Sequence, residues 1–277
     1  MNITAADVNK LRKQTGAGMM DCKKALVEAN GDFEAAVDIL RKQGQKVAAK
    51  RSDRDAAEGL VIAKTTADGT KGVMVVVNCE TDFVAKNEDF GKFANQILDV
   101  AMEHSPADIE ALKALPFAGN GITIGEKIIE QTGVIGEKID LSGYEQINAA
   151  MVYAYNHPGN KLASMVGLSK GGDFQEAAKD VAMQIAAMDP VAVSKEEVPQ
   201  ETIDREIEVG KEQAIQEGKP ADMAEKIAMG RLNKFFKENT LLSQEYIKDN
   251  KKTIEQYLKG FDAELTVTSF KRIALSV

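Results

Sequence analysis

The sequence predicts an α+β protein with an N-terminal three-helix module, a two-part α+β core with antiparallel sheets, and an inserted helical hairpin. Two patterns lead to this prediction: β-branched runs flank turn-forming residues in two places, and apolar residues at helical spacing fill much of the remaining chain. A third segment is highly charged and lacks aromatic residues, which is typical of a coiled-coil arm. We divide the chain into residues 1–54, 55–140, 141–188 with 233–277, and the hairpin 189–232.

The first part reads as three short helices. Thr4 can cap the first helix, the second stops at Gly31, and Asp32 caps a third that we expect to end near Gly44. Such short helices are marginal alone, so we expect a compact bundle. The basic segment Arg41–Arg54 is interpreted as a solvated helix end and linker, with a weak RNA contact as the minority alternative.

The second part begins with a hairpin of strands. Leu60–Lys64 alternates like a strand, turn residues follow at 68–72, and the β-branched run Val73–Cys79 returns antiparallel to it. Helical spacing then continues from Phe90 to Val100, and another helix is expected over Ile124–Gln131.

The third part repeats this plan loosely. Apolar runs at Ala149–Tyr155 and Leu162–Leu168 flank the turn sequence Asn156–Asn160, and helical spacing follows over Phe174–Met188. We expect the alternating segment Ala263–Ala274 to complete this second sheet, because the preceding strands alone would leave an open edge.

The hairpin segment contains two charged helical stretches, Thr202–Glu217 and Ala221–Leu232, separated by Gly218-Lys219-Pro220. Two antiparallel helices with a short loop form a helical hairpin, which could also support self-association. The apolar residues expected in its seam are Ile203, Ile207, Ala214, Ile215, Met223, Ile227 and Met229.

Composition favours a protein-binding protein of the cytoplasm. The net charge of −8 argues against direct nucleic-acid binding, which usually needs a basic face. No run approaches the roughly 18 apolar residues of a membrane span, and the N-terminus lacks the features of a signal peptide. Cys22 and Cys79 could form one bridge, but an intracellular setting favours free buried thiols. With only His104 and His157 besides them, a Cys/His metal cluster is not expected.

No pattern for covalent chemistry or for a bound cofactor is present, so we expect no enzyme. The sequence lacks a phosphate-binding loop, a nucleophile elbow and a dinucleotide fingerprint. Glu80 and Asp82 form a close carboxylate pair, which leaves metal binding or acid–base work as an alternative to a solvated turn. Between strand and helix, Thr81 can act as an N-cap; Phe83 is a core residue in one interpretation and a partner contact in the other.

Two motifs closely resemble the elongation factor Ts family, the bacterial and organellar nucleotide-exchange factors for elongation factor Tu. They are TGAGMMDCKKAL at Thr15–Leu26 and NCETDFVAKN at Asn78–Asn87, and they occur in the family's order. Further similarity lies in Ile124–Glu137, with its IGE ending, and in Gly230–Tyr246. Two positions depart from the family: Gln184 stands where many members carry His, and Tyr246 where Phe is usual, which we expect a partly exposed pocket to tolerate.

The resemblance implies a non-enzymatic exchange factor with a ubiquitin-associated-like N-terminal module. Such a factor binds GDP-bound elongation factor Tu and promotes GDP release by disturbing the magnesium and phosphate site. A generic adaptor that releases no nucleotide is the rival function. The partner-binding residues carried over from the family are Thr81, Asp82, Phe83, Val84, Arg12, Met19, Met20, Lys23, Ile135, Gly136 and His157.

Overall fold

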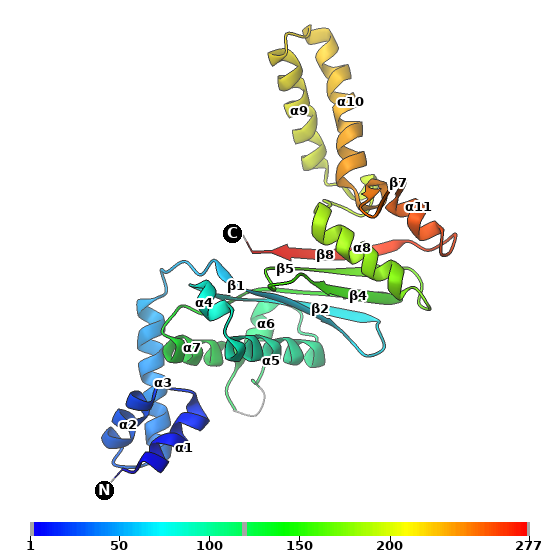
Figure 1. Ribbon diagram of the computed structural model, residues 1–277. Helices are drawn as coiled ribbons and strands as arrows, with labels where there is room; N and C mark the ends of the chain where they lie inside the picture. Colours follow the sequence, from blue (N-terminus) through cyan, green and yellow to red (C-terminus); the bar gives the residue numbers. More distant parts are fainter. Residues whose placement is uncertain (1–2, 118–120, 276–277) are drawn as a thin grey trace. The chain divides into compact units, whose positions relative to one another are not determined.

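The computed structural model describes residues 3–117 and 121–275, which form two compact units (Figure 1). One unit contains Met1–Ile62, Met74–Tyr144 and Leu275–Val277, and the other contains Ala63–Val73 and Glu145–Ala274. Helices and small antiparallel sheets occur together, so the predicted α+β class is confirmed. The division into four parts stays a prediction. In the described part of the chain, no helix has both the length and the apolarity that crossing a membrane requires.

The N-terminal helices of the first unit are α1 (Ala5–Thr15), α2 (Met19–Glu28) and α3 (Phe33–Lys50). Thr4 caps α1 as predicted, in a capping box with Asp7, and the Asp32 carboxylate accepts the Ala35 N–H at the start of α3. Their shared core contains Leu11, Cys22, Ala25, Leu26 and Ala36, all fully buried.

Helix α3 is longer than predicted. It continues past Gly44 to Lys50, and it packs against α7 (Ile124–Ile135). Gly44 lies where the two helices cross, and a Cβ added at Gly133 of α7 would stand 2.4 Å from the Gly44 Cα. The glycine therefore permits a close helix crossing and does not end the helix. The basic segment 41–54 is thus mostly helix, and the interpretation as a linker is wrong for residues 45–50.

The first sheet has the strand order β1-β2-β3, with β1 (Glu58–Thr65), β2 (Lys71–Cys79) and β3 (Asp140–Asn148). The hairpin β1–β2 was predicted, whereas β3 was not, because its residues are mostly polar. An edge strand with one solvated side tolerates such a composition. Between β2 and β3 lie α4 (Asp82–Ala85), α5 (Glu88–His104), α6 (Ile109–Ala114) and α7.

The second unit contains an antiparallel sheet of order β4-β5-β8: β4 (Met151–Asn156), β5 (Leu162–Leu168) and β8 (Val267–Ala274). The prediction that the last strand completes this sheet is confirmed. Helix α8 (Gln175–Met188) packs on β4 and β5 with the buried side chains of Ala177, Val181 and Ile185.

The helical hairpin consists of α9 (Gln200–Gln216) and α10 (Ala221–Asn239), which pack side by side (Figure 1). Its buried seam is made of small residues with one leucine: Gly210, Ala214, Ala224, Ala228 and Leu232. Three residues predicted in the seam, Ile215, Met223 and Met229, are instead about half exposed. The helices approach closely at the seam, where a Cβ added at Gly210 would lie 3.2 Å from the Ala228 Cα. The remaining elements are η1 (Lys195–Glu197), η2 (Leu241–Ser243), β6 (Glu245–Tyr246), β7 (Asp249–Thr253) and α11 (Ile254–Lys259).

Candidate functional site

Phe83 lies on α4, a single helical turn that follows β2. The Thr81 hydroxyl caps this helix by accepting the Val84 N–H at 3.4 Å, as predicted. Ala85 faces inward, but the Phe83 side chain is 83% exposed. The interpretation of Phe83 as a core residue is therefore wrong. An aromatic ring this exposed buries little apolar surface within its own chain, so most of that surface is available to a partner.

The neighbours of Phe83 are held by polar contacts on both sides. Lys86 Nζ lies 2.6 Å from Asp82 Oδ2, an exposed pair within the same turn. On the inner side, the buried Cys79 thiol donates to the Thr81 carbonyl at 3.2 Å. Burial, together with the nearby Glu137 carboxylate, raises the pKa of Cys79 to about 12, so this thiol stays protonated and unreactive. Both cysteines are free and buried, as the sequence favoured.

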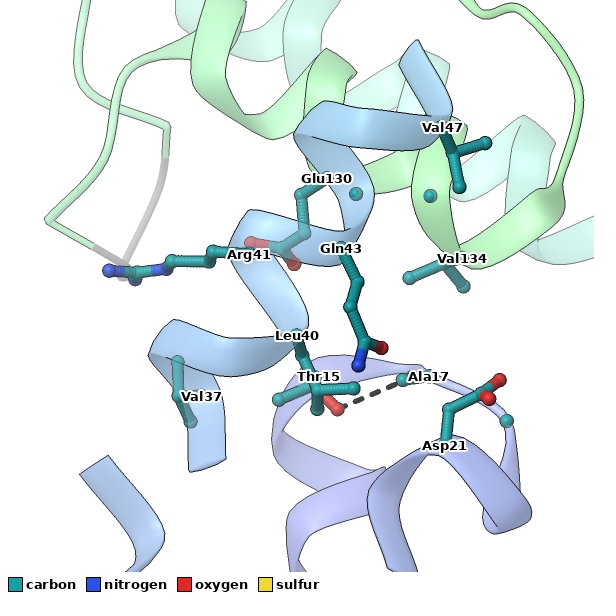
Figure 2. A pocket seen from close by; sticks show the side chains of 13 residues that line it. Thr15, Ala17, Asp21, Val37, Leu40, Arg41, Gln43, Val47, Glu130 and Val134 are labelled. Atoms are coloured by element: carbon teal, nitrogen blue, oxygen red, sulfur yellow. Dashed lines mark hydrogen bonds between the residues drawn. The ribbon is translucent and has the colours of Figure 1, made fainter. Parts of the chain in front are cut away.

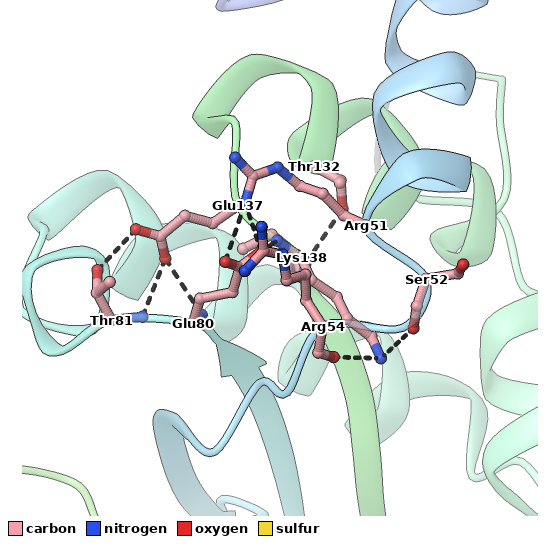
Figure 3. Close-up of polar contacts among 9 residues, drawn as sticks. Arg51, Ser52, Arg54, Glu80, Thr81, Thr132, Glu137 and Lys138 are labelled. Carbon is pink, nitrogen blue, oxygen red and sulfur yellow. Dashed lines mark hydrogen bonds and ion pairs between the residues drawn. The ribbon is translucent and has the colours of Figure 1, made fainter.

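The turn before α4 is bound by a carboxylate from a distant loop (Figure 3). Glu137 Oε2 accepts the N–H groups of Glu80 and Thr81 at 3.1 and 3.0 Å, and its Oε1 accepts the Thr81 hydroxyl at 2.7 Å. A single side chain thus satisfies three donors of one turn. Charge-assisted bonds of this kind are among the stronger hydrogen bonds in proteins.

The contact between these two loops is reciprocal. Glu80 Oε1 accepts the Lys138 N–H at 2.6 Å and also lies 2.7 Å from Arg51 Nη1. These two donors lower the pKa of Glu80, whose side chain is only 16% exposed. Lys138 Nζ donates in turn to the carbonyls of Ser52 and Arg54. The end of α3, the turn before α4 and the loop after α7 are therefore joined through one polar network (Figure 3).

Two more predicted residues line a groove of about 580 Å³ beside this turn. Val84 and Ile135 contribute to it, with Thr15 and Gly16 from the end of α1 and Phe93 from α5. Gly136 directly follows Ile135 and ends α7 with a left-handed conformation, φ 80°, which glycine adopts without strain. The structure thus brings the TDFV and IGE motifs to the same groove.

The residues predicted on the N-terminal helices are all exposed. Met19 and Met20 begin α2 and are 53% and 61% exposed, so neither packs into the core. Arg12 and Lys23 are also exposed. Methionine side chains are flexible and polarizable, which suits an adaptable contact surface.

A smaller cavity, of about 160 Å³, lies where the N-terminal helices meet α7 (Figure 2). Val37, Leu40 and Val47 from α3 face it together with Val134 of α7 and Thr15 of α1. None of the predicted site residues lines this cavity.

The other discussed residues lie in the second unit. His157 is exposed in the turn after β4, and its Nδ1 is 3.0 Å from the Tyr155 hydroxyl. Gln184 is fully buried and accepts the Ile247 N–H, so it supports the fold around β6 and does not offer its side chain to a partner. Tyr246 is also buried and donates to Asp180, so the expectation of a partly exposed pocket is wrong.

Sequence reasoning missed the roles of Arg51, Glu137 and Lys138. Glu137 ends the recognised IGE motif, but no local pattern shows that its carboxylate reaches a turn 56 residues away. The proposed carboxylate pair is also divided, because Glu80 faces Arg51 whereas Asp82 faces Lys86. Over residues 3–117 and 121–275, no group of three or more His, Cys, Asp or Glu side chains is placed to hold a metal ion.

Comparison with known proteins agrees with the resemblance of the motifs. The family model described as "Elongation factor TS" matches residues 80–276. Elongation factor Ts of Christiangramia forsetii is 56% identical over 274 residues, which cover 99% of this chain and 98% of the relative. The Cytophaga hutchinsonii protein of that name is 54% identical over 276 residues, or 99% of both chains. That of Flavobacterium psychrophilum is 53% identical over 274 residues, or 99% and 98%. The chain therefore belongs to the elongation factor Ts family.

Proposed function

We propose that the chain is a nucleotide-exchange factor of the elongation phase of protein synthesis that binds GDP-bound elongation factor Tu and promotes GDP release. In this proposal Phe83 enters the partner and disturbs its magnesium and phosphate site. No covalent step is involved. Met19, Met20, Lys23 and Arg12 of the N-terminal helices add further contacts, as do Val84 and Ile135 beside the groove.

One observation carries this proposal: Phe83 is 83% exposed on a turn in which Glu137 binds two backbone N–H groups and one hydroxyl. A large aromatic side chain that points outward leaves apolar surface in contact with water, which is unfavourable, and it stabilises its own chain little. Exposed aromatic residues on a fixed frame are typical anchors of protein interfaces. The geometry therefore supports insertion into a partner better than it supports a packing role.

The energy available from Phe83 accounts for part of the exchange reaction. Burying a phenylalanine side chain stabilises a complex by about 1.5–3 kcal/mol, which is roughly 10–100-fold in an equilibrium constant. The binding of GDP and the binding of the factor to elongation factor Tu are linked. If the factor weakens GDP binding, GDP weakens the binding of the factor to the same extent. Other contacts must therefore hold the factor on its partner while the nucleotide leaves.

The test is the release of fluorescently labelled GDP from elongation factor Tu after unlabelled nucleotide is added in excess. The proposal predicts that amounts of the chain well below those of the partner accelerate release, because an exchange factor turns over. An adaptor would bind elongation factor Tu in a sedimentation or titration experiment and leave the release rate unchanged. Binding without acceleration would contradict the proposal and favour the adaptor.

A further inference from the structure

We propose that Glu137 is a positioning residue for Phe83, and that it acts through the hydroxyl of Thr81. This inference rests on the proposed function, since it concerns how the Phe83 turn is held for exchange. Glu137 itself is only partly buried and lies on the loop after α7, whereas Phe83 lies on α4.

Helix α4 cannot hold itself in place. It contains four residues, and a helix of one turn has almost no stability of its own. Phe83 does not anchor it either, because that side chain is mostly exposed. Apart from the small buried side chain of Ala85, the direction in which Phe83 points therefore depends on the polar contacts at the start of the turn.

Thr81 connects Glu137 to this turn. A hydroxyl has one proton to donate, and its position is set by the best acceptor within reach. Here that proton goes to Glu137 Oε1 at 2.7 Å, which leaves a lone pair of the same oxygen for the Val84 N–H at 3.4 Å. Glu137 thus orients the hydroxyl that caps α4 by accepting the N–H of Val84, the residue after Phe83.

The backbone contacts act in the same direction. Glu137 Oε2 binds the N–H groups of Glu80 and Thr81, so the entry into α4 is fixed as well as its cap. Glu80 in turn accepts the Lys138 N–H, so the loop that contains Glu137 and the turn before α4 are bonded to each other in both directions. Together these bonds hold the backbone beneath Phe83 from two sides.

The first test replaces Glu137 by glutamine. Glu137→Gln keeps the size of the side chain and one oxygen, but its amide nitrogen only donates, so the side chain can no longer accept both the Thr81 hydroxyl proton and the two backbone N–H groups. We expect GDP release at saturating concentrations of the chain to slow about tenfold, which corresponds to roughly 1.4 kcal/mol. The concentration for half-maximal effect should change far less, because the other contact residues remain. Thr81→Val removes the hydroxyl at nearly constant volume and should slow release in the same way. It provides the test if Glu137→Gln folds poorly.

A double-mutant cycle separates positioning from a general structural effect. If Glu137 acts through Phe83, adding Glu137→Gln to Phe83→Ala should slow release no further. Glu110→Gln is the matched control, because Glu110 pairs with Lys113 on α6 and is 77% exposed there. We expect it to leave exchange unchanged.

The outcomes distinguish this inference from the function on which it rests. If the unmodified chain accelerates no release, the exchange function and the positioning role both fail. If it does accelerate release and Phe83→Ala slows it, but Glu137→Gln and Thr81→Val release GDP normally, the positioning role alone is overturned. Fully additive effects in the cycle would also overturn it.

Discussion

The crossing of α3 and α7 should tolerate a methyl group on one helix and not on the other. A Cβ built on Gly133 would lie 2.4 Å from the Gly44 Cα and 3.3 Å from the Gly44 nitrogen. Carbon atoms pack at about 3.5–4.0 Å, so the helices would have to separate by roughly 1 Å. A Cβ built on Gly44 would instead find its nearest neighbours at 3.5 and 3.7 Å, which is ordinary contact.

The magnitudes follow from these distances. Overpacking a tight contact costs about 1–3 kcal/mol, and replacing a helical glycine by alanine returns about 1 kcal/mol of helix propensity. Gly133→Ala should therefore lose up to about 2 kcal/mol in the free energy of unfolding. Gly44→Ala gains the same helix propensity without the clash, so its free energy of unfolding should be unchanged or higher by up to about 1 kcal/mol.

The measurement is urea unfolding followed by circular dichroism, with both variants and the unmodified chain under identical conditions. The pair is its own control, because each variant adds one methyl group to the same crossing. Equal stability of the two variants, or a loss confined to Gly44→Ala, would refute the reasoning from the crossing geometry.

Two further predictions concern carboxylates with several hydrogen-bond donors around them. The folded pKa of Glu80 is lowered by the Lys138 N–H and Arg51, so the stability it contributes is complete above its unfolded pKa of about 4.3 and is lost as the pH falls through the folded value. Unfolding titrations should show the stability difference from Glu80→Gln shrinking below about pH 4.3, and a difference that grows there would contradict the assignment. In the second unit, Asp180 accepts the hydroxyls of Tyr246 and Tyr257 and pairs with Lys248. Tyr246→Phe should lower the free energy of unfolding by about 1.5–3 kcal/mol in urea melts, and an unchanged midpoint would show that the bond is dispensable.

The fold was predicted best where local pattern and burial agree. The apolar run Val73–Cys79 lies in a strand that is buried throughout, and the helical spacing of Phe90–Val100 lies in a helix with one buried face, so in both elements the local pattern matches the burial. Strand β3 was not predicted, because a polar edge strand has no continuous apolar run. The length of α3 was predicted wrongly, because glycine is common at helix ends and only the tertiary contact with Gly133 shows the role of Gly44.

The site divides in the same way. The cap at Thr81 is a local interaction over three residues, and its residue type is sufficient to predict it. The exposure of Phe83 could not be derived from spacing, because phenylalanine is usually buried and only the motif's resemblance to a family favoured a contact role. Glu137, Arg51 and Lys138 act across loops distant in sequence, so their partners become visible only in the folded chain.

The central claim is that Phe83 serves exchange and not folding, and one paired measurement tests it directly. Labelled GDP release from elongation factor Tu is measured for Phe83→Ala alongside its unfolding curve, with Val191→Ala, a 46% exposed apolar residue of the other unit, as the control. We predict that Phe83→Ala slows the stimulated release by about 10–100-fold while its free energy of unfolding stays within about 0.5 kcal/mol of the unmodified chain. A loss of about 3–5 kcal/mol in stability, with exchange per folded molecule unchanged, is the behaviour of a core phenylalanine and would contradict the account.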